Sequence, residues 1–224
     1  MRLLIITLLL TAISSVAHIA SGAYPKASDR AHRWQLHLDM GDLMFYRDKE
    51  SGDGYWILVY EVTNETKEDH RWIPQFDLVT DKGEIIQDGD NVPRNVQLNV
   101  LDIFGDPLMK SQSDASGPLL QGEENAIRSL SIWKAGREDI REVQVFAGGV
   151  SGDTAEVIHP ITGETKKLHR VLQFSWLVHG GVDQIGLQPM TKRAVANGVS
   201  TRKLDSDNSH RAGQDSATIK WVFR

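Results

Sequence analysis

The chain has 224 residues, of which 40% are hydrophobic and 25% charged, with a formal net charge of −5 and no cysteine. This length suits one domain, or one domain with a small appendage, and the composition is ordinary for a globular protein that can build a sizeable core. The acidic balance argues against nonspecific binding to nucleic acid, which needs a basic surface. The lack of cysteine excludes disulfides, thiolate catalysis, cysteine-ligated zinc and acylation at a lipoprotein cysteine.

The N-terminus has the features of a secretory signal peptide. A positive charge near the start is followed by an apolar stretch at residues 3–12 and then by small residues. Cleavage after Ala17 or after Ala23 fits the small-x-small rule, so we expect residues 1–23 to be a signal peptide and residues 24–224 to be one domain. An uncleaved anchor, the alternative, would be the one contact with a membrane. The sequence therefore predicts export to the periplasm or out of the cell.

Two strands are predicted before the most conspicuous stretch of the chain. Residues 34–40 alternate between apolar and polar side chains, which predicts a strand with one face in water. Residues 43–47 predict a second, short strand, and the polar residues 48–54 predict a loop.

Residues 54–66, GYWILVYEVTNET, give the strongest strand signal in the sequence. Aromatic and β-branched residues dominate, and the first half is apolar on both faces, so we expect a central strand covered on both faces. Leu58 is therefore predicted to lie in the core. Asn64 predicts a turn at the end of the strand, because asparagine bonds to nearby backbone groups. The triplet that starts there also fits the N-x-T glycosylation pattern, although the turn is the simpler interpretation.

A hairpin follows the central strand. Residues 71–80 predict a strand that lies at an edge or carries a bulge, because Pro74 has no N–H. A tight turn at residues 81–83 leads back into a strand at residues 84–87.

At residues 93–104 the apolar side chains recur at helical spacing, which predicts a short helix that ends at Gly105. We expect this helix to cover an open edge or end of a sheet. Residues 105–124 are loop-like in composition.

The second half of the chain predicts five more strands, two of them joined by a hairpin turn at residues 160–163. These strands are residues 126–133, 142–147, 154–158, 166–179 and 217–224. Residues 180–216 are polar and predict a long irregular loop without an obvious strand, in which residues 189–197 could form a short helix.

Eight or nine short strands, with turn residues between them and one short helix, predict a mainly β fold. The interpretation we favour is an antiparallel immunoglobulin-like β-sandwich that forms a single domain. A closed β-barrel is the alternative.

The motifs that could carry chemistry are incomplete, so we assign no catalytic, cofactor-binding or metal-binding residue. The eight histidines form neither a His-x-His nor an HExxH group. Ser151 lies in GVSG, which lacks the second glycine of a G-x-S-x-G nucleophile elbow. Asp88, Asp90 and Asn91 offer oxygen atoms to a hard cation, but the glycine and glutamate of an EF-hand are missing and a solvated turn is favoured.

Aromatic and basic residues are the remaining candidates for binding. Among the six tryptophans, Trp72 and Trp133 lie at predicted strand ends, where they could form surface platforms that stack on a ligand such as a sugar ring, although packing in the core or at its rim is the simpler interpretation. Basic residues could let the loop at residues 180–216 dock to an acidic surface, although a solvated loop is the simpler interpretation. They are Lys192, Arg193, Arg202, Lys203 and Arg211.

Several stretches together resemble a group of uncharacterised exported bacterial proteins of the planctomycete type. They are the signal peptide, YWILVYEVTNET, FDLVTDKGEIIQDG, the VSGDT and HPITGE turns, and the terminal KWVFR. The resemblance covers most of the mature chain and implies an immunoglobulin-like β-sandwich, with no activity attached. The strand end V-T-N-x-T also resembles secreted immunoglobulin-like domains of the telokin kind.

Three functions remain open at this point. The export signal, the strand pattern and the missing catalytic set favour a non-catalytic envelope protein that binds a protein or a cell-surface polymer through its loops. A carbohydrate-binding module that uses Trp72 or Trp133 is one alternative. A hydrolase with a dispersed metal site of histidine and aspartate residues is the other.

Overall fold

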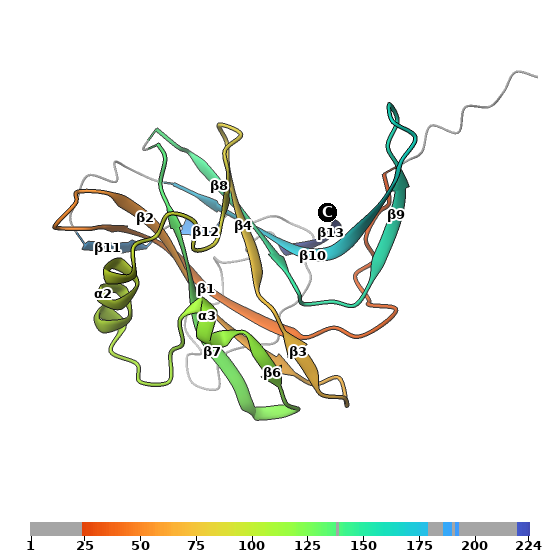
Figure 1. Ribbon diagram of the computed structural model, residues 1–224, viewed down its shortest axis with the longest axis horizontal. Coiled ribbons are helices and arrows are strands. Elements are labelled where there is room, and N and C mark those ends of the chain that lie inside the picture. Colours follow the sequence, from red (N-terminus) through yellow and green to blue (C-terminus); the bar gives the residue numbers. More distant parts are fainter. Residues whose placement is uncertain (1–23, 138, 179–185, 190, 193–218) are drawn as a thin grey trace, which may run out of the picture.

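The computed structural model describes residues 24–137, 139–178, 186–189, 191–192 and 219–224, and these form two antiparallel sheets packed face to face (Figure 1). The smaller sheet contains, in spatial order, β11 (Gly186–Pro189), β1 (His37–Arg47), β2 (Gly54–Asn64) and β7 (Gly122–Lys134). The larger sheet contains β12 (Thr191–Lys192), β10 (Thr165–Leu177), β8 (Glu142–Gly148), β4 (Gln75–Thr80) and β5 (Ile85–Gln87), and β10 also pairs with β9 (Thr154–Ile158) and β13 (Ile219–Phe223).

Neither sheet closes on itself among the described strands, so the structure confirms the antiparallel sandwich over the closed barrel. The five strands predicted in the second half of the chain are all present, with small shifts at their ends. Two short strands, β3 (His70–Trp72) and β6 (Gly117–Leu119), form a separate ribbon. The described residues contain the helix α2 (Arg94–Phe104) and the single-turn α3 (Gln112–Ala115), and neither has the length and apolar character needed to cross a membrane.

The main core lies between the two sheets and is built from alternate residues of each strand. Aromatic pairs join the layers: the rings of Tyr60 and Phe76 meet edge to face with centroids 4.8 Å apart. Other fully or almost fully buried members of this core are Phe45, Trp56, Leu58, Leu78, Val143, Val145, Phe174 and Trp176.

β2 is apolar on both faces because both faces are covered, as the sequence predicts. Trp56 and Leu58 point into the core between the sheets. Tyr55 and Ile57 point the other way, into a second cluster that contains the buried Val100 of α2.

α2 confirms the helix predicted there, but its position was predicted wrongly. Gly105 ends it in the left-handed conformation, at φ 60°, and donates its N–H to the carbonyl of Leu101 at 3.1 Å. The helix covers the outer face of the smaller sheet and not an edge or end (Figure 1). Its buried Val96 and Val100 need an apolar surface, and they pack in one cluster with Ile57 of β2.

β1 is one bulged strand and not the two strands that were predicted. Its pairing with β2 shifts between Met40 and Leu43, which moves the buried positions from the even-numbered Leu38 to the odd-numbered Leu43. A side chain on Gly41 would meet the carbonyl oxygen of Val59 at 3.0 Å, so glycine suits the bulge.

Residues 71–80, predicted as one strand, are split by Pro74 into β3 and β4. β3 pairs with β6, whereas β4 lies inside the larger sheet between β8 and β5, so Pro74 is at neither an edge strand nor a bulge. A residue without an N–H removes no ladder hydrogen bond at such a break. The hairpin of β4 and β5 is confirmed, with Gly83 of its turn at φ 82°.

Two segments predicted as irregular contain short elements. Residues 105–124 hold α3, β6 and the start of β7. In residues 180–216, β11 pairs with β1 and β12 pairs with β10, so the predicted absence of strands is wrong. The helix predicted at residues 189–197 is wrong at its start, which is strand, and its remainder from residue 193 lies outside the described residues, as do the basic residues beyond Lys192.

Candidate functional site

The two tryptophans considered as possible ligand platforms are core residues, so they cannot serve as platforms and the simpler interpretation of core packing holds. Trp72 and Trp133 are both 0% exposed, and a buried ring cannot stack on a ligand. Trp72 packs edge to face with Phe76 at 6.2 Å, and Trp133 donates its Nε1–H to the carbonyl oxygen of Phe76 at 3.2 Å. Trp133 also lies opposite Trp56 in the register of β2 and β7, so a position near the end of a predicted strand does not place a side chain at the rim.

The other residues that the sequence offered as candidates do not come together in one site among the described residues. Asn64 is buried, and its Nδ2 donates to the carbonyls of Glu68 at 2.8 Å and Leu119 at 3.0 Å, which confirms the turn and encloses the atom that glycosylation would need. Asp90 is exposed on a turn in which Asn91 has φ 56°. In the part of the chain that the structure describes, no three histidine or acidic side chains lie close enough together to hold a metal ion.

Arg170 is a buried cation at the centre of a polar cluster. It is 1% exposed, and its guanidinium lies 3.5 Å from the ring centroid of Trp221. Its Nη2 donates to the carbonyls of Ser28 at 2.8 Å and Asp29 at 3.1 Å, and its Nη1 donates to Oε1 of Gln35 at 2.8 Å. The side chain thus ties the N-terminal segment to β10 and β13.

Asp153 extends this cluster. Its carboxylate accepts the backbone N–H of His32 at 2.9 Å and of Arg33 at 2.8 Å. Burial acts to raise the pKa of Asp153, but these two donors and the charge of Arg170 outweigh it and hold the pKa below the usual value. Ser151 is buried in the same cluster and accepts from Nη1 of Arg170 at 3.3 Å. The cluster is therefore internally bonded and anchors the segment at residues 28–35.

Asp88 is an enclosed carboxylate with one unpaired oxygen. Its Oδ1 accepts the N–H of Ile132 at 2.8 Å, and Gly89 donates to the carbonyl of Ile132 at 2.9 Å, so the two residues close the outer edge of β7. Its Oδ2 and the hydroxyl of Ser131 are inaccessible to solvent and have no hydrogen-bond partner among the described residues. Burial raises the pKa of Asp88 to about 7, although the N–H groups of Ile132 and Gly89 act to lower it.

Asp88→Asn is expected to stabilise the protein at pH 8 by about 1–3 kcal/mol, because a neutral amide replaces an enclosed carboxylate. The folded pKa of Asp88, about 7, lies above the ordinary value of 3.8. The folded state therefore keeps a proton on Asp88 that the unfolded state loses, and the contribution of Asp88 to stability falls as the pH rises from about 4 to about 7. Asparagine does not titrate, and its Oδ1 can still accept from Ile132.

Urea unfolding of both proteins at about pH 4, 6 and 8 measures this effect. The difference in unfolding free energy should grow in favour of the variant with rising pH and level off above about pH 7. A difference that stays constant over this interval contradicts the raised pKa of Asp88.

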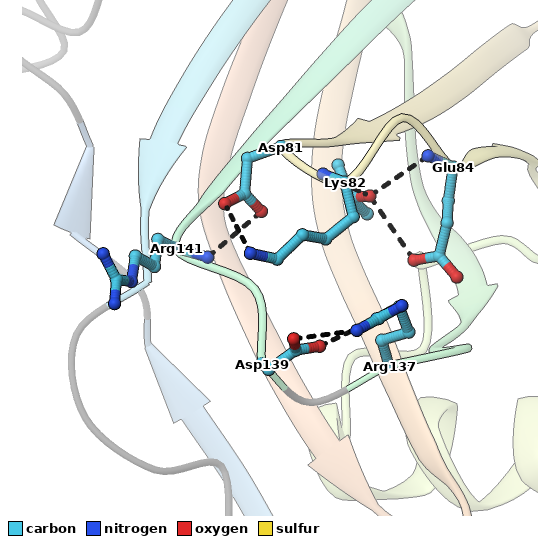
Figure 2. A network of polar contacts seen from close by, with 7 residues as sticks. Asp81, Lys82, Glu84, Arg137, Asp139 and Arg141 are labelled. Atoms are coloured by element: carbon cyan, nitrogen blue, oxygen red, sulfur yellow. Dashed lines mark hydrogen bonds and ion pairs between the residues drawn. The ribbon is translucent and has the colours of Figure 1, made fainter.

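A charged cluster lies where the turn between β4 and β5 meets the segment before β8 (Figure 2). Asp81 accepts the backbone N–H of Arg141 at 3.2 Å and forms an ion pair with Lys82 at 3.7 Å. Arg137 donates to both oxygens of Asp139, at 2.8 and 2.9 Å, and this hydrogen bonding lowers the pKa of Asp139 to about 2. Because the ion pairs of this cluster are solvated, they add little stability.

β9 and the first half of β10 form a two-stranded arm that projects from the larger sheet (Figure 1). Its tip holds Ile158 and Ile161, which are 72% and 89% exposed. The turn is ordered by its own backbone: His159 donates to Glu164 at 2.8 Å, and Gly163, at φ 70°, donates to His159 at 2.9 Å. The predicted hairpin is confirmed, but sequence reasoning missed its exposed tip, since exposure depends on where the rest of the sheet ends.

These features define the class of protein: an antiparallel β-sandwich whose buried polar clusters are structural and whose arm holds apolar side chains in solvent. Comparison with known proteins finds no matching family model, no matching curated protein and no matching solved structure. The similarity to exported bacterial proteins of the planctomycete type therefore stays a prediction.

Proposed function

We propose that the protein is an exported, non-catalytic binding protein that contacts a partner protein through the tip of the β9–β10 arm. The observation that carries this proposal is the exposure of Ile158 and Ile161 at the tip. A side chain that is 89% exposed, as Ile161 is, adds almost nothing to the core. Burying such a side chain against another protein is favourable by about 1.5–3 kcal/mol, so two neighbouring isoleucines form a suitable anchor for an interface.

The export part of the proposal is supported by the charged, apolar and small-residue regions of residues 1–23. It is tested by sequencing the N-terminus of the protein recovered from outside the cytoplasm. A mature chain that starts at His18 or Tyr24 supports export. A protein that keeps Met1 and stays in the cytoplasm contradicts it.

The carbohydrate-binding alternative loses its basis, because both of its candidate platforms are buried. Among the described residues, no cluster of potential metal ligands supports the hydrolase alternative.

Replacing Ile158 and Ile161 by serine is expected to abolish partner binding and leave the melting temperature within about 2 °C of wild type, since exposed side chains contribute little to stability. The measurement is photo-crosslinking in the cells that export the protein, with a benzophenone amino acid at position 160, between the two isoleucines. The expected result is a discrete adduct that the double substitution removes.

Ile85 provides a matched control, because it is 61% exposed but lies on β5, outside the arm. Its replacement by serine should leave the adduct at position 160 unchanged, and a probe at position 85 should not give the same adduct. Equal adducts from both probes, or no adduct at position 160, would overturn the proposed binding tip.

A further inference from the structure

The hydrogen-bond pattern of the arm shows which backbone groups of β9 point away from β10. Arg170 donates its N–H to the carbonyl of Asp153 at 3.0 Å, and His159 donates to Glu164 at 2.8 Å. Directly opposite residues of an antiparallel pair alternate between bonded and non-bonded pairs. The odd-numbered positions of residues 153–159 therefore bond to β10, and the backbone of the even-numbered positions faces outward.

The outward backbone groups of Glu156 and Ile158 have no hydrogen-bond partner among the described residues. Both residues are exposed, so this edge of the arm is open to an additional strand.

Two other edges of the fold are protected. The edge of β7 is closed by residues 88–89 and by Lys110, whose N–H donates to the carbonyl of Arg128 at 2.9 Å. The outer edge of β10 in the arm carries the exposed Lys166 and Lys167, and lysine on an edge discourages strand addition. β9, with the sequence TAEVI, has neither lysine nor proline.

We propose that the outer edge of β9 binds an extended segment of the partner protein by strand addition, and this inference rests on the proposed function of the arm. The segment carries lysine or arginine opposite Glu156, the one charged side chain of β9, between β-branched residues. Lys167 lies opposite Glu156 on β10, but no hydrogen bond or ion pair joins the two side chains, so the carboxylate is available to a basic residue.

The charge of Glu156 also argues against a second copy of this chain as the occupant. An antiparallel pair of two β9 strands centred on Glu156 would place two carboxylates directly opposite each other, and like charges opposite each other are destabilising. A basic segment of another protein meets no such repulsion.

The test uses the acetylated and amidated peptide Thr-Val-Lys-Val-Thr and the ¹⁵N-labelled mature protein. With the lysine opposite Glu156, the peptide is expected to bind with a Kd on the order of 1 mM, to shift the amide signals of Glu156 and Ile158, and to slow their hydrogen exchange. The same peptide with glutamate in place of lysine should bind at least about fivefold more weakly. The absence of any shift at these amides at about 5 mM peptide overturns the inference.

Two variants at one position separate the backbone from the charge. Glu156→Pro removes an outward N–H that β10 does not use, so the arm should keep its fold while peptide binding is lost. Glu156→Ala keeps the N–H and should bind the lysine and glutamate peptides equally. If Glu156→Pro binds the lysine peptide as well as wild type does, strand addition is wrong.

The two proposals fail in different ways. An adduct at position 160 that survives Glu156→Pro would mean that the partner binds the tip without adding a strand, which keeps the proposed function and overturns this inference. Loss of the adduct in the isoleucine double substitution, together with its loss in Glu156→Pro, supports both. Sedimentation that shows a dimer, abolished by Glu156→Pro, would assign the edge to a second copy and overturn the heterologous partner.

Discussion

Leu58→Asp is expected to abolish folding of the β-sandwich. Leu58 is 0% exposed in the middle of β2, opposite Leu43 of β1 and Ser131 of β7. Its side chain packs in the core between the two sheets, where no described cation could pair with a carboxylate. Burying an unpaired charge costs several kcal/mol, and losing the leucine adds about 2–5 kcal/mol, against a total stability of about 5–15 kcal/mol.

Far-ultraviolet circular dichroism and urea unfolding of the purified variant measure the result. The variant should lack a cooperative transition under conditions in which the wild-type domain unfolds in one step. Ile85→Asp makes the same kind of change at an exposed position and should shift the unfolding free energy by no more than about 0.5 kcal/mol. A Leu58→Asp protein that unfolds at the wild-type midpoint would contradict the central position of β2.

The sequence predicts β2 well because its signal is local. Alternation and β-branched content identify the strand, and apolar residues on both faces show that both are covered. What covers each face depends on contacts between distant parts of the chain. The apolar stripe of α2 at Val96 and Val100 predicts a buried helix face, but it does not select the outer face of the smaller sheet over an edge.

The errors in strand assignment have related causes. The bulge at Gly41 reverses the alternation within β1, and a reversed alternation looks like two strands when only the pattern is read. The missing N–H of Pro74 predicts an edge strand or a bulge, but whether the residue marks an edge, a bulge or a break between sheets depends on the partners of β3 and β4.

The candidate site was harder to predict than the fold. The positions of Trp72 and Trp133 along the predicted strands suggest exposed rings, whereas burial depends on the layers above and below them. The arm's exposed Ile158 and Ile161 could not be recognised either, because the same residue types normally lie in a core. One useful signal was present: Arg170 interrupts an otherwise apolar strand face, and a charge at such a position needs partners.

Those partners make Arg170 the second position where a large effect is expected. The carbonyls that its guanidinium contacts belong to Ser28 and Asp29, which lie 142 and 141 residues away in the sequence. Arg170→Met would remove the cation and five donors, leaving these carbonyls and the amide of Gln35 without their partner. Removing one side of a buried charged network typically costs about 3–5 kcal/mol, so the unfolding free energy should fall by about that amount.

Arg170→Lys and Arg128→Met are suitable comparisons for this variant. A lysine keeps the charge but cannot bind as a planar fork that also stacks on Trp221, so an intermediate loss is expected. Arg128 forms an exposed ion pair with Asp106, and its replacement by methionine should change the unfolding free energy by less than about 1 kcal/mol.

Hydrogen exchange distinguishes loss of the anchor from general destabilisation in Arg170→Met. The amides of His32 and Arg33 donate to Asp153, which lies beside Arg170 in the same cluster. If Arg170 holds the N-terminal segment in place, these amides should exchange much faster in the variant. Amides in the middle of β2 should then exchange faster only by the factor that the loss of global stability predicts. Equal loss of protection in the segment and in β2 would show that Arg170 supports the whole fold and not this attachment in particular.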